Sequence, residues 1–375
     1  MAESLNLLMN GVLIIDKPAG LTSHDVVNRV RRLLNQRSVG HLGTLDPMAT
    51  GVLPLVIGNF TRLAQFYVGS EKTYEGTVRF GFCTDTYDAE GEPTTEPKTV
   101  RLSREELEPA IGKFRGVIEQ VPPPFSAKKI KGVPAYKLAR KQKEVNLAPV
   151  QVEIKELEVL GVDVDRMRFR ARVASGTYMR SVAHDLGQVM GCGAHLESLR
   201  RTTVAEFTED QAHTLEELAA KARKWRHEKD EDHDSVTQAA ASREAAEDRS
   251  PRRKPWEKAS AIDQAPEGRK SLFHPLLEGP PENRLPVQPI GNGTHNDLQP
   301  LLELFIHPRK LLPQMPAVTA DELTVARIRD GRPINLLELS RARQIKVFSG
   351  QRDLIAIATR VAGTLFHPKI VFVGA

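Results

Sequence analysis

The sequence predicts an α+β fold, and three observations lead to that prediction. Several segments combine β-branched residues with alternating apolar and polar side chains, as half-buried strands do, and residues 72–81 are an example. Other segments begin with capping residues and continue with apolar residues at helical spacing, as residues 22–34 do. Finally, 375 residues are too many for one typical core, so the chain is expected to contain more than one domain.

The composition is that of a folded protein with a mild basic excess. Hydrophobic residues make up 40% of the chain, and 53 Lys and Arg residues face 48 Asp and Glu residues. The resulting sequence pI is about 9.1, and a basic protein of this kind suits a polyanionic partner, although many soluble proteins are equally basic. Only Cys83 and Cys192 are present, far apart, so neither a disulfide framework nor a zinc cluster is expected.

The N-terminal residues and the apolar runs bear on location. The first residues lack the early Lys or Arg of a signal peptide. No apolar run approaches the length of a membrane span. These observations lead us to expect a cytoplasmic protein.

The first elements expected along the chain are a buried strand and a capped helix. Residues 12–15 are apolar, and the strand that contains them is expected to end at Lys17-Pro18, which is a turn signal. A helix start follows at residues 22–27. The adjacent Ser, His and Asp of this start point in different directions on a helix, so they cannot form the relay of a hydrolase triad.

A glycine-rich loop, GHLGTLDPMATG, occupies residues 40–51 and contains one carboxylate, Asp46. Glycine lets the backbone take positive φ or approach another molecule closely. One interpretation is that Asp46 caps a very short helix that begins at Pro47 and ends at Gly51. The other is that Asp46 has a chemical role, because a carboxylate among apolar neighbours needs a partner or a function.

The remaining elements follow the same two patterns. Residues 150–162 and 166–174 are expected to form paired strands, and a capping-box pattern at Ser103 predicts a helix. The acidic loop at residues 84–92 lacks the ligand spacing of a calcium loop, so no metal site is expected there. In the C-terminal part, a helix at 322–330 and strands at 345–348, 354–358 and 370–373 are expected.

Several segments resemble the motifs of the TruB type of tRNA pseudouridine synthase. They are GHLGTLDPMATGVLPLVIG from residue 40, KPAGLTS from residue 17, SGTYMRS from residue 175 and the run at 191–202. The resemblance covers residues 11–207 strongly and 311–373 loosely. It implies a pseudouridine synthase catalytic domain with a mixed, largely antiparallel sheet over residues 1–225. It also implies a small PUA-like β-barrel domain over residues 301–375.

Between these two regions, residues 226–300 depart from the compact family pattern. They are rich in charge, Ala, Ser, Pro and Gly. Such a segment cannot bury enough apolar surface to offset the entropy of ordering. A disordered low-complexity insertion is therefore expected.

The resemblance makes Asp46 the catalytic nucleophile, with Tyr74 and Arg180 as further catalytic residues. Arg180 would pair with Asp46, favour its charged form and orient it. Tyr74 would lie against the target base, as aromatic rings stack on unpaired RNA bases, although a half-buried strand tyrosine is the simpler alternative. The ionised Asp46 would either attack the anomeric carbon or remove the 2′ proton of the ribose, and the sequence does not choose between these routes.

The resemblance also implies substrate-binding roles for His41, Tyr178 and Leu199. His41 would hold the space vacated by a flipped base, or only form hydrogen bonds within its loop. Tyr178 and Leu199 would line the pocket, whereas packing alone is the alternative for both. Lys17 and Pro18 are expected to support the site structurally, and a solvated loop lysine is the alternative for Lys17.

The implied reaction isomerises the uridine at position 55 in the T loop of tRNA to pseudouridine. It exchanges a carbon–nitrogen bond for a carbon–carbon bond without net oxidation or hydrolysis, so no cofactor and no metal are expected. The base must first leave its stack, at a cost of a few kcal/mol. The expected partner is the tRNA T stem-loop, with no membrane, obligate protein partner or guide RNA, and the protein is expected to be a monomer.

Two alternatives stay open from the sequence. A guide-dependent pseudouridylase would have a similar catalytic domain, but the KTYEG segment at 72–76 and the PUA-like tail favour a stand-alone enzyme. The other alternative is an RNA-binding or tRNA-folding module in which the pocket grips a flipped base and catalysis is incidental.

Overall fold

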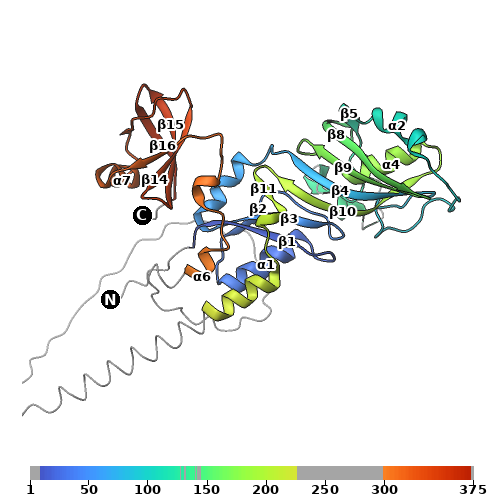
Figure 1. The fold of residues 1–375 in the computed structure, drawn as a ribbon, viewed down its shortest axis with the longest axis horizontal. Coiled ribbons are helices and arrows are strands. Elements are labelled where there is room, and N and C mark those ends of the chain that lie inside the picture. The colour runs from blue at the N-terminus through green and yellow to red at the C-terminus, as the bar shows by residue number, and fades with distance from the viewer. Residues whose placement is uncertain are drawn as a thin grey trace, which may run out of the picture. The chain divides into compact units, whose positions relative to one another are not determined.

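The structure is a computed structural model, and Figure 1 shows its fold. It describes residues 9–126, 128–130, 132–139, 141, 145–225 and 299–372. Most of the segment expected to be a disordered insertion, residues 226–298, lies outside these residues. The described segments 9–225 and 299–372 belong to one compact unit, which contains two separate larger sheets.

The first sheet contains nine strands among the described residues, and seven of them follow the order β1-β3-β10-β4-β9-β8-β5. Strand β2 pairs with β3, and β11 pairs with β10. Every pair is antiparallel except β3 with β10. The mixed, largely antiparallel sheet expected from the sequence is therefore confirmed. The strands are β1 (Gly11–Lys17), β2 (Val39–His41), β3 (Thr50–Ile57), β4 (Lys72–Phe80), β5 (Gly116–Gln120), β8 (Val150–Asp163), β9 (Arg166–Val173), β10 (Ala194–Val204) and β11 (Phe207–Thr208).

Helices begin where the sequence supplies capping residues. Thr22 caps the first helix, and the Asp25 side chain bonds back to the Thr22 backbone in a capping box. Ser103 and Glu106 form the same box at the next long helix, so both predicted helix starts are confirmed. The helices of this part are α1 (Ser23–Leu34), η1 (Gly58–Phe66), α2 (Arg104–Gly112), α3 (Ala135–Ala139), α4 (Met179–Val189), η2 (Glu209–Gln211) and one through residues 215–225.

Strand β9 shows how the sequence divides the sheet into two faces. Its residues alternate between buried and more exposed along the whole strand. The buried side chains, such as Phe169, join a core cluster with α1, α2 and α4, and Figure 1 shows α2 and α4 lying together against this end of the sheet. On the other face Arg170 pairs with Glu75 at 2.7 Å and Arg172 pairs with Glu71 at 3.0 Å. This face is therefore covered by neutralised charges.

The second large sheet has five strands in the order β12-β14-β15-β16-β13, with helix α7 against it. The small C-terminal β domain expected from the sequence is thus present. One expected strand was misplaced, because β16 starts at Leu365 and ends at Val371 rather than spanning 370–373. Its buried Phe366, Pro368 and Ile370 alternate with more exposed residues. The elements are α6 (Gln299–Leu302), η4 (Pro308–Lys310), β12 (Ala317–Ala320), α7 (Glu322–Arg329), β13 (Ile334–Asn335), β14 (Gln344–Ser349), β15 (Asp353–Ala362) and β16; a separate two-stranded sheet pairs β6 (Lys129–Ile130) with β7 (Val133–Pro134).

The two larger sheets share a second apolar cluster. Phe60 and Phe207 from the first part pack in it with Phe348 and Phe372 from the second. The Asn59 amide also donates to the Phe372 carbonyl at 2.8 Å. None of the described helices is long and apolar enough to cross a membrane.

We predict that Gly51→Ala destabilises the fold. Gly51 has φ +98°, where only glycine is unstrained, and a Cβ there would overlap the backbone carbonyl oxygen of Arg201. Strain and overlap together should lower the free energy of unfolding by about 2 kcal/mol or more, measured by urea unfolding. Gly69→Ala is the matched control because a Cβ at Gly69 meets no atom within 4 Å. Equal stabilities of the two variants would contradict this account.

Candidate active site

Asp46 lies in the loop between β2 and β3, and its side chain is 35% exposed. The backbone after it makes one turn, in which the Ala49 amide donates to the Asp46 carbonyl at 3.1 Å. The chain then enters β3 at Thr50, so no helix begins at Pro47. The interpretation of Asp46 as a helix cap is therefore wrong. Instead, Gly51 pairs with Lys17 at the end of the β1–β3 ladder, so the chain is already extended where the short helix was expected to end.

Arg180 is directed at this carboxylate from the first turn of α4. Its Nε lies 2.8 Å from Oδ2 of Asp46, and its side chain is only 5% exposed. Its two terminal nitrogens donate to the carbonyls of Thr86 at 3.1 Å and Phe125 at 3.0 Å. These contacts fix the guanidinium plane and leave Nε for the ion pair.

Asp88 is a second carboxylate beside Arg180, with Oδ2 3.5 Å from Nη1. Burial raises the pKa of Asp88, while hydrogen bonds from Thr86 and the charge of Arg180 lower it and the charge of Asp46 raises it. Its oxygens also accept from the Thr86 hydroxyl at 2.5 Å and the Glu90 amide at 3.1 Å. Asp88 therefore ties the 84–92 loop to the cation that faces Asp46.

Tyr74 lies on β4 opposite Arg201 of β10. Burial raises the pKa of the Tyr74 phenol, although a hydrogen bond with Arg201 and the charge of Arg201 oppose that shift. The charge of Asp46 raises it further. The Tyr74 side chain is therefore protonated at neutral pH.

Tyr178 is the residue that precedes α4, and its backbone is held by the Gln120 side chain. The Tyr178 amide donates to Oε1 of Gln120 at 2.8 Å, and Nε2 of Gln120 donates back to the Tyr178 carbonyl at 3.1 Å. Burial raises the pKa of Tyr178, and the charges of Arg180 and Asp46 also act on it. Leu199 on β10 is 8% exposed and packs in the same core cluster as Tyr74.

His41 ends β2 at the start of the glycine loop and is half-buried. Burial, followed by the charge of Arg201, lowers the pKa of its imidazole, while a hydrogen bond with the Gly43 backbone opposes the shift. His41 is therefore neutral at pH 7, when it can both donate and accept one hydrogen bond. The structure thus joins Arg180 to Asp46 by an ion pair, joins Tyr74 to Arg201 by a hydrogen bond, and places His41 at the start of the loop that carries Asp46.

Comparison with known proteins agrees with this geometry. Residues 31–179 match the model of the TruB family pseudouridylate synthase N-terminal domain, and residues 180–242 match the tRNA pseudouridylate synthase B C-terminal domain. A protein named tRNA pseudouridine synthase B from Solibacter usitatus is 43% identical over 366 residues, which cover 97% of this chain and all of that protein. The chain belongs to the TruB family of pseudouridylate synthases.

Another relative and a solved structure are also similar to this TruB-family chain. The tRNA pseudouridine synthase B of Aquifex aeolicus is 47% identical over 212 residues, or 56% of this chain and 74% of that protein. A solved structure of an H/ACA ribonucleoprotein bound to a substrate RNA containing 2′-deoxyuridine has a chain with TM-score 0.57 and 20% identity, covering 97% of this chain and 85% of its own. That likeness establishes the shared pseudouridine synthase fold.

In this TruB-family chain, Lys17 binds backbone carbonyls of the glycine-rich loop on the C-terminal side of Asp46. Its side chain is fully buried, and Nζ donates to the carbonyls of Pro18 at 2.9 Å, Pro47 at 3.1 Å and Ala49 at 2.6 Å. Lys17 is thus not a solvated loop lysine. Pro18 is itself exposed, and its carbonyl takes part in this arrangement.

Arg201 binds backbone carbonyls of the same loop on the N-terminal side of Asp46, and its side chain is fully buried. It donates to the carbonyls of Val52 at 2.9 Å, Thr44 at 3.2 Å and Gly43 at 3.1 Å. Burial lowers the pKa of its guanidinium, and the hydrogen bond with Tyr74 and the charges of Tyr74 and Asp46 offset part of that effect. The two peptide groups just before Leu45 are therefore fixed by a residue about 150 positions later in the chain.

Sequence reasoning missed three residues that hold this TruB-family site together. They are Ser23, Asp88 and Arg201; the Ser23 hydroxyl accepts from the Leu45 amide at 2.8 Å and donates to its carbonyl at 3.1 Å. Ser23 and Arg201 lay inside segments that resembled family motifs and Asp88 lay in the acidic 84–92 loop, yet nothing in a strand or helix pattern marks a polar side chain as buried. Arg201 lies two residues after the buried Leu199 and is itself buried, but its neighbours Arg200 and Thr202 are polar too, so no alternation in the sequence marked it.

We predict that the stability contributed by Lys17 depends on pH between 8 and 10.5. Burial lowers the pKa of Lys17 from 10.5 to about 8. Within that window the unfolded chain binds more protons than the folded chain, so folding becomes more favourable as pH rises. Lys17→Met lacks this effect and also leaves the Ala49 carbonyl unpaired. The wild-type advantage in unfolding free energy, measured in urea, should therefore widen from pH 8 to pH 10.

Subtracting the unfolding free energy of Lys17→Met from that of the wild type removes the contributions of other titrating groups to this pH dependence. Lys72, whose pKa burial also lowers to about 8, is present in both proteins. Exposed Lys113→Met reports the effect of exchanging a surface lysine for methionine. If the difference in unfolding free energy between wild type and Lys17→Met narrows over this pH range, the folded chain stabilises the charged form of Lys17. Burial would then not lower the pKa of Lys17.

Proposed function

We propose that this chain converts uridine 55 in the T loop of tRNA to pseudouridine, without a guide RNA. The observation that carries the proposal is the Asp46–Arg180 pair, with Nε 2.8 Å from Oδ2, in a member of the TruB family. Relatives over 40% identical carry the name tRNA pseudouridine synthase B, which supports tRNA as the substrate. We also propose the division into a catalytic domain at 1–225 and a PUA-like domain at 301–375, with an insertion at 226–300 between them.

In the proposed reaction Asp46 acts on the ribose. The bond between C1′ and N1 of the uracil breaks, a bond between C1′ and C5 forms, C5 loses its proton and N1 gains one, so the atoms balance without a cofactor. Arg180 pairs with Asp46 and directs one of its oxygens, with Nε 2.8 Å from Oδ2. Either direct attack on C1′ or removal of the 2′ proton begins from this arrangement.

The surrounding residues would bind the flipped uridine. Tyr74 remains a neutral phenol, so its proposed role is contact with the base rather than proton abstraction by a phenolate. Tyr178 and Leu199 would add apolar surface against the uracil, which offsets part of the unstacking cost of a few kcal/mol. Neutral His41 would occupy the space left in the RNA by the extruded base. Lys17 with Pro18 would keep the loop in the shape that presents Asp46.

The function is tested by incubating the purified chain with an unmodified tRNA transcript and no other RNA. We expect pseudouridine at position 55 alone, located by chemical labelling and mass spectrometry. A transcript in which that uridine is replaced by cytidine is the control. Modification that requires an added guide RNA would instead establish the guide-dependent alternative, and modification at another position would overturn the proposed specificity.

We predict that Asp46→Asn abolishes turnover but retains RNA binding. The amide removes the charge that acts on the ribose while keeping the size of the side chain, so the rate should fall by at least about 10⁴-fold, by analogy with the loss of other essential catalytic groups. Tritium release from C5-labelled tRNA measures turnover, and filter binding measures affinity. Exposed Asp163→Asn is the matched control.

The same variant separates the enzyme from a tRNA-folding module. If Asp46→Asn keeps appreciable turnover, Asp46 is not the catalytic residue. If the variant is inactive yet rescues a strain that lacks the enzyme, then the biological role is the binding of tRNA with a flipped base and not catalysis. Inactivity without rescue is the result expected for an enzyme.

A further inference from the structure

A stacked pair of rings joins helix α4 to the 84–92 loop, one helical turn beyond Arg180. The Tyr87 ring lies on the His184 imidazole, with ring centroids 3.8 Å apart and an angle of 13° between the planes. His184 follows Arg180 by four residues on α4, so the two side chains lie on one face of the helix. The loop therefore contacts two successive turns of this face.

The residues on either side of Tyr87 supply both loop contacts of Arg180. The Thr86 carbonyl accepts from Nη1 at 3.1 Å, and Oδ2 of Asp88 lies 3.5 Å from the same nitrogen. Because these two oxygens flank Tyr87 in the chain, a displacement of Tyr87 moves both of them. The place of Tyr87 thus governs the surroundings of the guanidinium, whose Nε lies 2.8 Å from Asp46.

Tyr87 has a backbone conformation that is costly for a bulky residue. Its φ is +66°, in the left-handed region. Such conformations persist where the surrounding structure enforces them, and they gather at functional sites. Leu196 of β10 holds the backbone, because its amide donates to the Tyr87 carbonyl at 3.0 Å and its carbonyl accepts from the Ala89 amide at 3.0 Å. The stack on His184 is the contact that the side chain adds to this pairing.

Both rings of the stack are uncharged at pH 7. Burial lowers the pKa of the His184 imidazole, and burial followed by the charge of Asp185 raises the pKa of the Tyr87 phenol. Nδ1 of His184 is buried and has no hydrogen-bond partner in the part of the chain that the structure describes. On that side of the imidazole no hydrogen bond sets its orientation, so the face-to-face contact with Tyr87 does. Stacked rings attract each other beyond the area they bury.

We propose that the Tyr87–His184 stack positions Arg180 for the reaction at Asp46. The stack fixes the 84–92 loop on α4, the loop presents its two oxygen ligands to the guanidinium, and Nε is left facing the catalytic carboxylate. Within the described part of the chain, no hydrogen bond or ion pair joins either ring to Asp46, so both are positioning residues. The proposal rests on the proposed function, which makes Asp46 the group that acts on the ribose.

The kinetic test uses variants of the full chain that remove or keep the stack. Tyr87→Ala and His184→Ala remove it, whereas Tyr87→Phe and His184→Phe keep two facing rings. Tyr87→Gly removes the stack but also relieves the left-handed backbone, which glycine adopts without strain. Tritium release from C5-labelled tRNA gives kcat and KM separately, and thermal unfolding gives the stability of each variant.

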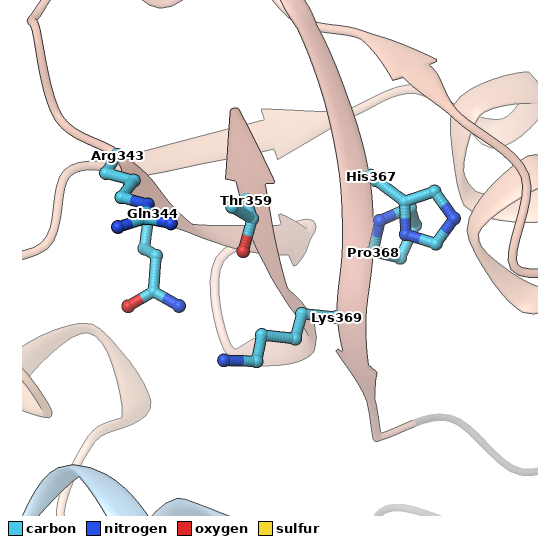
Figure 2. A pocket seen from close by; sticks show the side chains of 6 residues that line it. All are labelled: Arg343, Gln344, Thr359, His367, Pro368 and Lys369. Atoms are coloured by element: carbon cyan, nitrogen blue, oxygen red, sulfur yellow. The ribbon is translucent and has the colours of Figure 1, made fainter. Parts of the chain in front are cut away.

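Two controls remove similar side chains elsewhere. Phe82→Ala removes a ring that packs on His195 of β10, with centroids 4.5 Å apart, just before the 84–92 loop. His367→Ala removes an exposed histidine of β16, which Figure 2 shows among the side chains that line a hollow of the C-terminal sheet. Neither side chain has a ring contact with α4 among the described residues, so both controls should keep the wild-type kcat.

We expect kcat to fall by about 10- to 100-fold in the alanine and glycine variants with KM unchanged, because a small misplacement of a group that acts on the transition state costs this much. The phenylalanine variants should keep kcat. The double variant Y87A/H184A should be no slower than either single variant, since each removes the same contact. Wild-type kcat in Tyr87→Gly would overturn the proposal, and so would alanine variants that lose only thermal stability.

A second readout does not depend on turnover. In ¹⁵N NMR the Nε–H of Arg180, buried against Asp46, should give a signal protected from solvent exchange, assigned by its loss in Arg180→Lys. We expect this signal to be lost in Tyr87→Ala and kept in Tyr87→Phe. Its persistence in Tyr87→Ala would show that the stack does not position Arg180. If the wild type shows no turnover, the proposed function fails, while this spectrum still decides the role of the stack.

Discussion

The structure depends on the ion pair between Asp46 and Arg180. Arg180 is 5% exposed, and a buried guanidinium is stable only when its donors and its charge are matched. Two carbonyls and two carboxylates supply that match, from the 84–92 loop, the 121–126 segment and the glycine loop. Asp46 itself is 35% exposed, so solvent screens the pair, but removal of the carboxylate leaves the buried Arg180 without one of its partners, which couples the site to the packing of α4.

A second constraint is the shape of the glycine loop itself. Lys17 accounts for the carbonyls of Pro47 and Ala49, which follow Asp46, and Arg201 accounts for those of Gly43 and Thr44, which precede it. The loop has no regular secondary structure, so its carbonyls need partners from other parts of the chain. Both partners are cations, and they supply positive potential around Asp46 while they hold the backbone.

The sequence by itself determined the α+β class, the capped starts of α1 and α2 and most strands, because capping and alternation are local patterns that neighbouring residues specify. Motif resemblance also drew attention to Asp46 and Arg180. The sequence did not determine that Ser23 and Arg201 are buried against the glycine loop, that Asp88 is buried beside Arg180, that Gly51 abuts Arg201, or that no helix follows Asp46. Only the tertiary structure decided these, because burial and the pairing of polar groups depend on which strands become neighbours. The parallel pairing of β3 with β10 brings Gly51 and Arg201 together across 150 residues of chain, and no local pattern records that contact.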